Sequence, residues 1–286
     1  MHTNEALRVA NDTRWLVNDT RAGSGAMRPT TIRDVARHAD VAVSTVSRVL
    51  NSSGYVSAAT REKVLRAVEA LNFQPNNLAR SLATGRTRTI ALVLPDITNP
   101  FFPTIARGVE DAASTRGYTV VLCNTDGDSA QEAAYVRTLR EQRVDGIIFT
   151  VSSEESGAVR DLLRDRFPLA LIDRQVEGAG VDSVLVDNVA CAREATRHLL
   201  RMGHRRIAYI NGPPDLTTSR ERQTGYCEAL REAGLEPEED LIRAADFKYA
   251  SGYDKMRDLL ESDTGMTAVF AGNDMMAIGA IRAVED

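Results

Sequence analysis

The stretch VAVSTVSRVLN, residues 41–51, has the apolar spacing of a short helix with two different faces. One face carries the apolar residues Val43, Val46, Val49 and Leu50, which recur every three or four positions. The other carries small hydroxyls and one arginine: Ser44, Thr45, Ser47 and Arg48. Such a helix can pack on a small core while its backbone comes close to a partner, because large side chains would hold the backbone away.

Two further helices are predicted around this stretch. Residues 31–34, TIRD, fit a capping box, and they open an apolar stripe of Ile32, Val35, Ala36 and Ala39. A short break at residues 40–42 then gives helix-turn-helix spacing. Ser57 predicts the start of a third helix that runs to about Leu71. The side chains of this helix expected to face the core are Val64, Leu65, Val68 and Leu71.

The charge is distributed unevenly along the 286 residues. The whole chain has a net charge of -5, yet residues 28–88 hold ten basic and four acidic side chains, a net charge of +6 that leaves -11 for the rest. A basic head on an acidic body is the pattern expected when one small domain meets nucleic acid. A solvated basic surface would give the same balance.

The helix-turn-helix spacing predicts that the second helix enters the major groove of DNA. Val43, Ser44 and Thr45 are then predicted to contact base edges. Ser47 and Arg48 are predicted to contact bases or phosphates. Ser44 and Ser47 alone would fit a solvated surface helix equally well.

A short fourth helix is predicted in FQPNNLARSLATGRTRT, residues 73–89. Pro75 can start it and Gly85 can end it, with Leu78, Ala79 and Leu82 on one face. A helix this short is marginal by itself, so we expect it to order only when another helix or DNA covers its apolar face.

The segments TIRDVARHADVAVSTVSRVLN, YVSAATREKV and PNNLARSL strongly resemble the DNA-binding head of the lactose-repressor (LacI) family of bacterial transcription regulators. The resemblance implies a homodimer on a palindromic operator of double-stranded DNA. It also implies that the fourth helix is a hinge helix in the minor groove, where Leu82 wedges between base pairs. The implied DNA-binding residues are Thr31, Val43, Ser44, Thr45, Ser47, Arg48, Asn51, Tyr55, Asn76, Ala79, Arg80 and Leu82.

From about Ile90 the chain alternates short apolar runs with amphipathic helices. The runs are IALVLP, YTVVLCN, VDGIIFT, FPLALID, SVLVD, RIAYING and TAVFAGND. This alternation predicts parallel sheets with helices on both faces and a ligand beyond the carboxyl ends of the strands. The segments to examine there are residues 96–102, 173–174, 187–188, 220–222 and 273–274.

In this body, NPFF, IDRQ, VDN, SRER, ADF and AGNDMMAIGA resemble the periplasmic ribose-binding proteins and the sugar-sensing repressors that share their two-lobed fold. The resemblance implies an effector site formed by Asn99, Phe101, Phe102, Asp173, Arg174, Arg222, Phe247 and Asn273. A pentose-like sugar suits these residues, since polar side chains pair with hydroxyls and aromatic faces cover the sugar ring. Purines, nucleosides and phosphorylated sugars remain alternative ligands. The phenylalanines could instead pack in the core, and Asp173 or Asn273 could instead cap the end of a strand.

The predicted fold is a small all-α helix-turn-helix head followed by an α/β two-lobed domain like that of the periplasmic binding proteins. The boundaries are an extension at 1–26, which is disordered or an upstream start-site artefact, a DNA-binding domain at 28–74 and a hinge helix with linker at 75–88. An effector-binding domain covers 89–286, with lobes at about 89–173 and 174–286. The second lobe is expected to lack the strands that complete it in the family.

Other functions find little support in the sequence. No apolar run is long enough to span a membrane and no signal peptide precedes the head, so a cytoplasmic protein is expected. Cys123, Cys191 and Cys227 lack metal-ligand spacing and are expected to be buried apolar residues. No catalytic arrangement, metal site or cofactor is predicted, so the protein is not expected to be an enzyme. The alternatives are a sugar-binding transport protein without a DNA role and a non-functional repressor fragment.

Overall fold

The computed structural model describes residues 30–286 except 52, 75–84, 177 and 263. The chain divides into two compact units, Met1–Asn76 and Asn77–Asp286. The predicted extension at residues 1–26 lies outside the described residues. So does most of the predicted hinge helix, with its four predicted DNA contacts Asn76, Ala79, Arg80 and Leu82.

The first unit contains the three predicted helices, α1 (Ile32–Ala39), α2 (Val43–Leu50) and α3 (Ala58–Ala70). Thr31 and Asp34 form the predicted capping box, in which the Asp34 carboxylate accepts the Thr31 N–H at 3.0 Å. Ser57 caps α3, because its hydroxyl accepts the N–H of Thr60 at 3.3 Å. Local hydrogen bonds of this kind satisfy donors that the first helical turn leaves unpaired.

The three helices meet in a small core centred on Val35, Val46 and Val64, which are fully buried. The prediction that Leu65 turns inward is wrong, because its side chain is 50% exposed. Val64, Ala67, Val68 and Leu71 follow the three-and-four spacing that faces the other two helices. Leu65 lies about 100° further round the helix, so it points to solvent.

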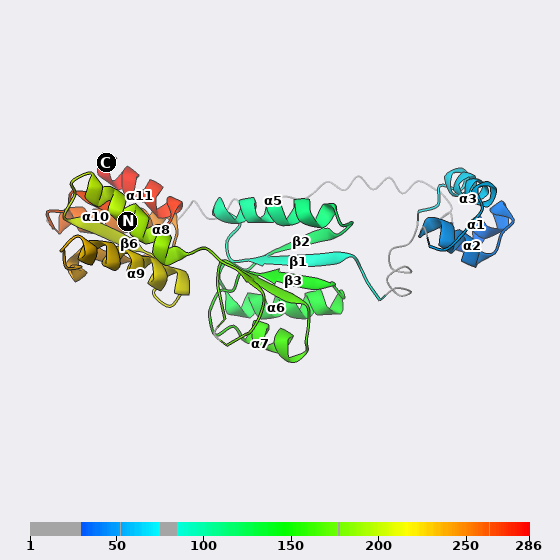
Figure 1. Ribbon diagram of the computed structural model, residues 1–286, viewed down its shortest axis with the longest axis horizontal. Coiled ribbons are helices and arrows are strands. Elements are labelled where there is room, and N and C mark those ends of the chain that lie inside the picture. Colours follow the sequence, from blue (N-terminus) through cyan, green and yellow to red (C-terminus); the bar gives the residue numbers. More distant parts are fainter. Residues whose placement is uncertain (1–29, 52, 75–84, 177, 263) are drawn as a thin grey trace, which may run out of the picture. The chain divides into compact units, whose positions relative to one another are not determined.

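The first lobe of the second unit is built on a parallel sheet with the strand order β2-β1-β3-β4-β5. The strands are β1 (Thr89–Leu94), β2 (Thr119–Asn124), β3 (Gly146–Phe149), β4 (Leu169–Ile172) and β5 (Ser183–Val184). Helix α5 (Phe101–Ser114) lies on one side of the sheet, and α6 (Ser129–Glu141) and α7 (Gly157–Arg164) lie on the other (Figure 1). Each side therefore has its own apolar core.

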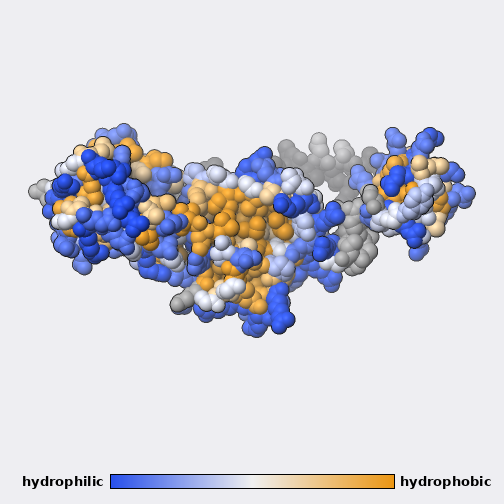
Figure 2. Space-filling model, viewed as in Figure 1, coloured by the Kyte–Doolittle hydropathy of each residue, from blue (hydrophilic) through white to orange (hydrophobic). Residues whose placement is uncertain are grey.

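The side of this sheet that carries α5 has an open apolar groove. It is lined mainly by Ile90, Ile105, Val109, Ala112, Ile148 and Ile172. Figure 2 shows apolar surface gathered over this lobe. A single helix is too narrow to cover the strands beside it, so isoleucines of β1, β3 and β4 stay partly accessible.

The second lobe has a parallel sheet with the strand order β7-β6-β8. Its elements are β6 (Ile207–Asn211), β7 (Ile242–Ala244), β8 (Ala268–Ala271), α8 (Asn188–Arg201), α9 (Thr217–Glu232), a 3-10 helix at Glu239–Leu241, α10 (Tyr249–Glu261) and α11 (Asp274–Glu285). Strand β7 is not among the predicted strands, because IRA is three residues long with an arginine at its centre. The predicted strand SVLVD is shortened to Ser183–Val184, which is β5 and pairs with β4 in the sheet of the first lobe.

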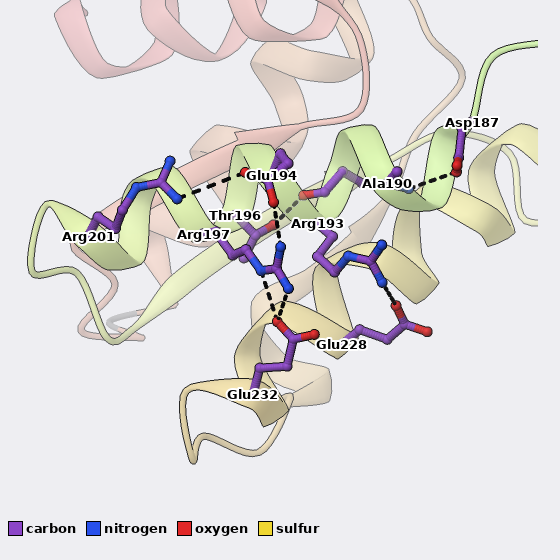
Figure 3. Close-up of polar contacts among 10 residues, drawn as sticks. Asp187, Ala190, Arg193, Glu194, Thr196, Arg197, Arg201, Glu228 and Glu232 are labelled. Atoms are coloured by element: carbon purple, nitrogen blue, oxygen red, sulfur yellow. Dashed lines mark hydrogen bonds and ion pairs between the residues drawn. The ribbon is translucent and has the colours of Figure 1, made fainter.

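Helices α8 and α9 approach closely and are joined by ion pairs (Figure 3). Gly225 allows the approach, since a Cβ atom there would lie 2.2 Å from the Val189 carbonyl oxygen. Arg193 pairs with Glu228 at 2.9 Å and Arg197 with Glu232 at 2.7 Å. Because solvent screens exposed ion pairs, each contributes little, and close packing together with several pairs fixes α9 on α8.

The three cysteines are free thiols in different surroundings. Cys123 is buried and Cys227 half-buried, but Cys191 is exposed on α8, so the prediction of burial is wrong for Cys191. Burial raises the pKa of the Cys123 thiol. Within the part of the chain that the structure describes, no helix has the length and hydropathy to cross a membrane.

Candidate functional site

The exposed face of α2 carries the side chains that the sequence assigns to DNA. Val43 is 41% exposed although it is apolar, and Ser44 and Arg48 are also exposed. Thr45 and Ser47 are half-buried at the edge of this face. Val46 and Val49 anchor the opposite side in the core, so the helix presents its small side chains outward.

The other predicted head residues lie around this face with different local roles. The Asn51 amide donates to the Ser47 hydroxyl at 3.2 Å, and Tyr55 is 91% exposed. Thr31 is half-buried, and its hydroxyl donates to the Asp34 carboxylate at 2.6 Å. The Tyr55 ring is therefore not part of the core of the head.

The second unit has a polar cavity of about 420 Å³ at the carboxyl ends of both sheets. All eight residues of the predicted effector site line it: Asn99, Phe101, Phe102, Asp173, Arg174, Arg222, Phe247 and Asn273. The volume is within the range of small-molecule sites. The structure thus brings together residues that are up to 174 positions apart in the sequence.

Six further polar or charged lining residues lie outside both the predicted effector site and the strand-end segments: Asp126, Ser152, Asp215, Thr218, Asp246 and Lys248. The first four follow predicted strands, so the carboxyl-end rule applied to every strand would have found them. Asp246 and Lys248 follow β7, which the sequence did not reveal. Asp187, Asn188 and Arg220 were singled out at strand ends but are not among the lining residues.

The first lobe contributes two phenylalanine rings at the start of α5. The rings of Phe101 and Phe102 meet edge to face, with centroids 5.2 Å apart. Phe102 also belongs to the apolar core beneath, while Phe101 is exposed. The Asn99 side chain accepts the Phe101 N–H at 3.1 Å, so it orients the first turn of α5 as well as lining the cavity.

Asp173 and Arg174 bring a buried pair of opposite charges to the cavity wall. Arg174 Nε lies 3.7 Å from an Asp173 carboxylate oxygen, and Arg174 Nη1 donates to the Val151 carbonyl at 2.8 Å. Burial raises the pKa of Asp173 despite the opposing effect of Arg174 and Arg222. Arg174 Nε is buried and has no hydrogen-bond partner among the described residues, so its only polar neighbour given there is the Asp173 carboxylate.

Arg222 joins three segments of the second lobe. Its Nε donates to Asn188 Oδ1 at 2.9 Å and its Nη1 to the Gly272 carbonyl at 2.6 Å. Its guanidinium carbon lies 5.8 Å from the centre of the Phe247 ring, within range of a cation–π interaction. These contacts hold the guanidinium at the cavity wall.

Phe247 adopts a backbone conformation that non-glycine residues avoid. Its φ is 68°, and such a conformation costs on the order of 1–3 kcal/mol. Asn273 stabilises it, because its Nδ2 donates to the Phe247 carbonyl at 2.8 Å while its Oδ1 accepts the Met276 N–H at 2.9 Å. Asn273 is therefore both the cap of α11 and a lining residue. Asp173, with φ also 68°, is a second residue of this kind at the cavity.

Carboxylates outnumber cations around the cavity. The acidic lining residues are Asp96, Asp126, Asp173, Asp215, Asp246 and Asp274, and the basic ones are Arg174, Arg222 and Lys248. Acidic side chains around the cavity are thus twice as numerous as basic ones. Within the described residues, no group of three or more His, Cys, Asp and Glu side chains is placed to bind a metal ion.

The two lobes are joined by a polar contact beside the cavity. Arg220 Nη2 donates to both carboxylate oxygens of Glu154, at 2.8 and 2.7 Å, and the Thr217 hydroxyl donates to the same carboxylate. Burial alone would raise the pKa of Glu154, but hydrogen bonds from Thr217 and Arg220 hold the pKa below its ordinary value. The buried Glu132 carboxylate accepts the Ser152 N–H and so supports the loop that carries Glu154.

A helical head with an outward-facing second helix, followed by a two-lobed α/β unit with a polar and aromatic cavity, defines a ligand-responsive DNA-binding regulator. Residues 31–76 match the family described as "Bacterial regulatory proteins, lacI family". Residues 87–286 match "Periplasmic binding proteins and sugar binding domain of LacI family". The chain belongs to the LacI family of bacterial transcriptional regulators.

Individual relatives agree with this assignment. The ribose operon repressor of Halalkalibacterium halodurans is 44% identical over 254 residues, which cover 89% of this chain and 75% of that protein. Catabolite control protein A of Priestia megaterium is 36% identical, with 90% and 77% coverage. Among solved structures, the lac repressor dimer bound to operator and the anti-inducer ONPF matches with a TM-score of 0.80 at 28% identity, covering 90% of this chain and 78% of that one.

Proposed function

We propose that this chain is a sugar-responsive repressor that binds a palindromic operator as a homodimer. Residues 28–74 read the DNA, residues 75–88 act as hinge helix and linker, and residues 89–286 bind the effector. The protein works by binding and carries out no chemical step. Since its partner is chromosomal DNA, it acts in the cytoplasm.

The outward face of α2 supports the DNA-binding part of this proposal. Val43, Ser44 and Thr45 contact base edges, and Arg48 reaches a guanine or a phosphate. Asn51 and Tyr55 contribute from the end of α2 and the loop that follows it. Leu82 wedges into the minor groove with Asn76, Ala79 and Arg80 beside it, and the unstacking it causes is offset by added contact.

The polar cavity supports a neutral sugar as the effector, and this is the observation that carries the proposal. Asn99, Asp173, Arg222 and Asn273 offer hydrogen bonds to hydroxyl groups, while Phe101, Phe102 and Phe247 cover the apolar side of a ring. The excess of carboxylates disfavours phosphorylated sugars and nucleotides. A ligand that binds one arrangement of the lobes better than another changes DNA affinity by that difference in binding energy.

The DNA-binding part is tested by fluorescence anisotropy with a palindromic duplex and a scrambled duplex at two salt concentrations. Arg48→Ala should weaken operator binding about 5- to 150-fold, the range expected for loss of a specific arginine contact. Arg66→Ala is the matched control, because Arg66 is exposed on α3, pairs with Glu62 and lies outside the predicted DNA-binding set. Equal effects of the two substitutions would contradict the assignment of α2 to the major groove.

The effector part is tested by calorimetric titration of the whole chain with D-ribose, other neutral aldoses and D-ribose 5-phosphate. Binding of a neutral sugar, with none of the phosphate, is the expected result. Binding of the phosphorylated sugar alone would contradict the charge argument. Sugar binding without any preference for the palindromic duplex would favour the transport-type alternative.

A further inference from the structure

The ring of Phe247 rests against a glycine that does not itself line the polar cavity. A Cβ atom on Gly212 would lie 2.0 Å from Phe247 Cζ and 2.2 Å from Cε1, distances at which atoms overlap. Phe247 lines the cavity, whereas Gly212 is buried and is not a lining residue. The ring therefore lies between Gly212 and the cavity.

The absence of a side chain at position 212 is needed for space and not for backbone freedom. Gly212 does not have a positive φ, unlike Gly203 or Gly234. Its N–H donates to Asn211 Oδ1 at 2.8 Å, and the Asn211 amide is in turn held by Gln223 at 2.9 Å. Alanine could adopt this backbone, so its only penalty would come from the atoms that its Cβ meets.

The Phe247 ring has little freedom to give way by a movement of its main chain. The Phe247 carbonyl is held by Asn273 Nδ2, and the Asp246 carboxylate before it accepts the Lys248 N–H at 3.0 Å. The Arg222 guanidinium lies on the ring and is itself fixed by Asn188 and the Gly272 carbonyl. A ring pushed away from Gly212 would thus move toward the open side, which is the cavity.

We infer that Gly212 is a positioning residue that sets the room available to the effector by seating the Phe247 ring. Any side chain at position 212 displaces the ring into the volume where the ligand binds. The inference rests on the proposed effector site, and it adds that a residue without ligand contact sets how large a ligand the second lobe accepts.

The test is a double-mutant cycle on the whole chain with Gly212→Ala, Phe247→Leu and the combination. Leucine lacks the Cζ and Cε1 atoms that alanine at position 212 would meet, so it removes the clash with the ring while keeping an apolar side chain. The approach to Ser219 Oγ, 2.6 Å from the added Cβ, is the same in both backgrounds. D-ribose affinity is measured by calorimetry and the unfolding midpoint by circular dichroism. Gly157→Ala is the control, since a Cβ atom there has no neighbour within 4 Å.

Gly212→Ala should weaken D-ribose binding at least tenfold and lower the unfolding midpoint in the presence of Phe247. With Leu at position 247, the same change should alter the affinity less than twofold and lower the midpoint by less than half as much, since only the approach to Ser219 Oγ remains. Equal effects in both backgrounds would overturn the inference, because the added methyl would then act elsewhere, for example on Ser219 Oγ, 2.6 Å from the same position. If the unchanged protein binds no aldose, the effector proposal fails. The change in unfolding midpoint caused by Gly212→Ala, compared between Phe and Leu at position 247, still decides whether Gly212 seats the ring.

Discussion

Removal of Glu154 and Arg220, singly and together, measures what the contact between the two lobes contributes. Arg220 contacts both carboxylate oxygens through one nitrogen, Nη2, while its Nη1 donates to the Asp215 carbonyl at 2.9 Å. Hydrogen bonds between charged groups are stronger than those between neutral groups. A hydrogen bond to a charged group contributes about 1.5–3 kcal/mol, and a fully exposed ion pair about 0.2–1 kcal/mol. The Glu154 side chain is 21% exposed and that of Arg220 50%, so a coupling of about 1 kcal/mol is expected, between the two limits.

The assay is urea unfolding of Glu154→Ala, Arg220→Ala and the double variant, followed by circular dichroism. With a slope of roughly 2 kcal/mol per molar urea, the coupling corresponds to a midpoint difference of about 0.5 M. The pair Arg257–Glu261 on α10 is the control, because both partners are largely exposed and four residues apart on one helix. Its coupling should be smaller than that of Glu154–Arg220, because solvent screens an exposed pair.

Additive effects of the two substitutions, within about 0.3 kcal/mol, would refute the reasoning. The pair would then be formed without stabilising the contact between the lobes. In that case the Thr217 hydroxyl and the packing of the loop over Glu132 would be the contacts to examine next.

The stability that the Glu154 contact provides should also depend on pH, because the pKa of Glu154 is lowered in the folded protein. The contribution to the free energy of unfolding is fully present above the ordinary glutamate pKa of about 4.3. It is lost as the pH falls through the lower pKa of the folded protein. The difference in urea midpoint between the unchanged protein and Glu154→Gln should therefore be constant from pH 7 to 5 and shrink only below that range; a change already at pH 6 would point to another group. In the head, Val46→Ala removes two fully buried methyl groups and should lower the free energy of unfolding by about 2 kcal/mol in a thermal melt. Leu65→Ala on the exposed side of α3 should stay within about 0.5 kcal/mol of the unchanged protein, and a larger loss would show that Leu65 packs in solution.

The helical head could be predicted from sequence because its signals are local. The valines of α2 recur at the helical period, and capping residues mark where α1 and α3 begin. Leu65 shows the limit of this reasoning. Leucine is apolar enough to be counted in a stripe, and only its angle around the helix excludes it.

Part of the lining of the polar cavity could be predicted, because an apolar run in the sequence shows where a strand ends and the residues after that end line the cavity. That rule leads to Asp173 and Asn273, whereas β7 has no apolar run, so Asp246 and Lys248 behind it gave no signal. The resemblance to the family points to Phe247 as a site residue. Its positive φ could not be predicted, because phenylalanine rarely adopts that conformation. The pair Glu154–Arg220 joins residues 66 positions apart. Helix and strand periodicity relates only residues that are close in sequence, so it could not predict this pair.

The apolar groove beside α5 has a practical consequence for the search for an effector. Thermal-shift screens usually report unfolding with dyes whose fluorescence increases on apolar surfaces. The method requires that the folded protein bind little of the dye. Here the folded protein offers such dyes a lined groove before any heating, so the signal would begin high and the melting transition would be compressed. Screening by calorimetry or by intrinsic circular dichroism avoids this background and leaves the groove out of the readout.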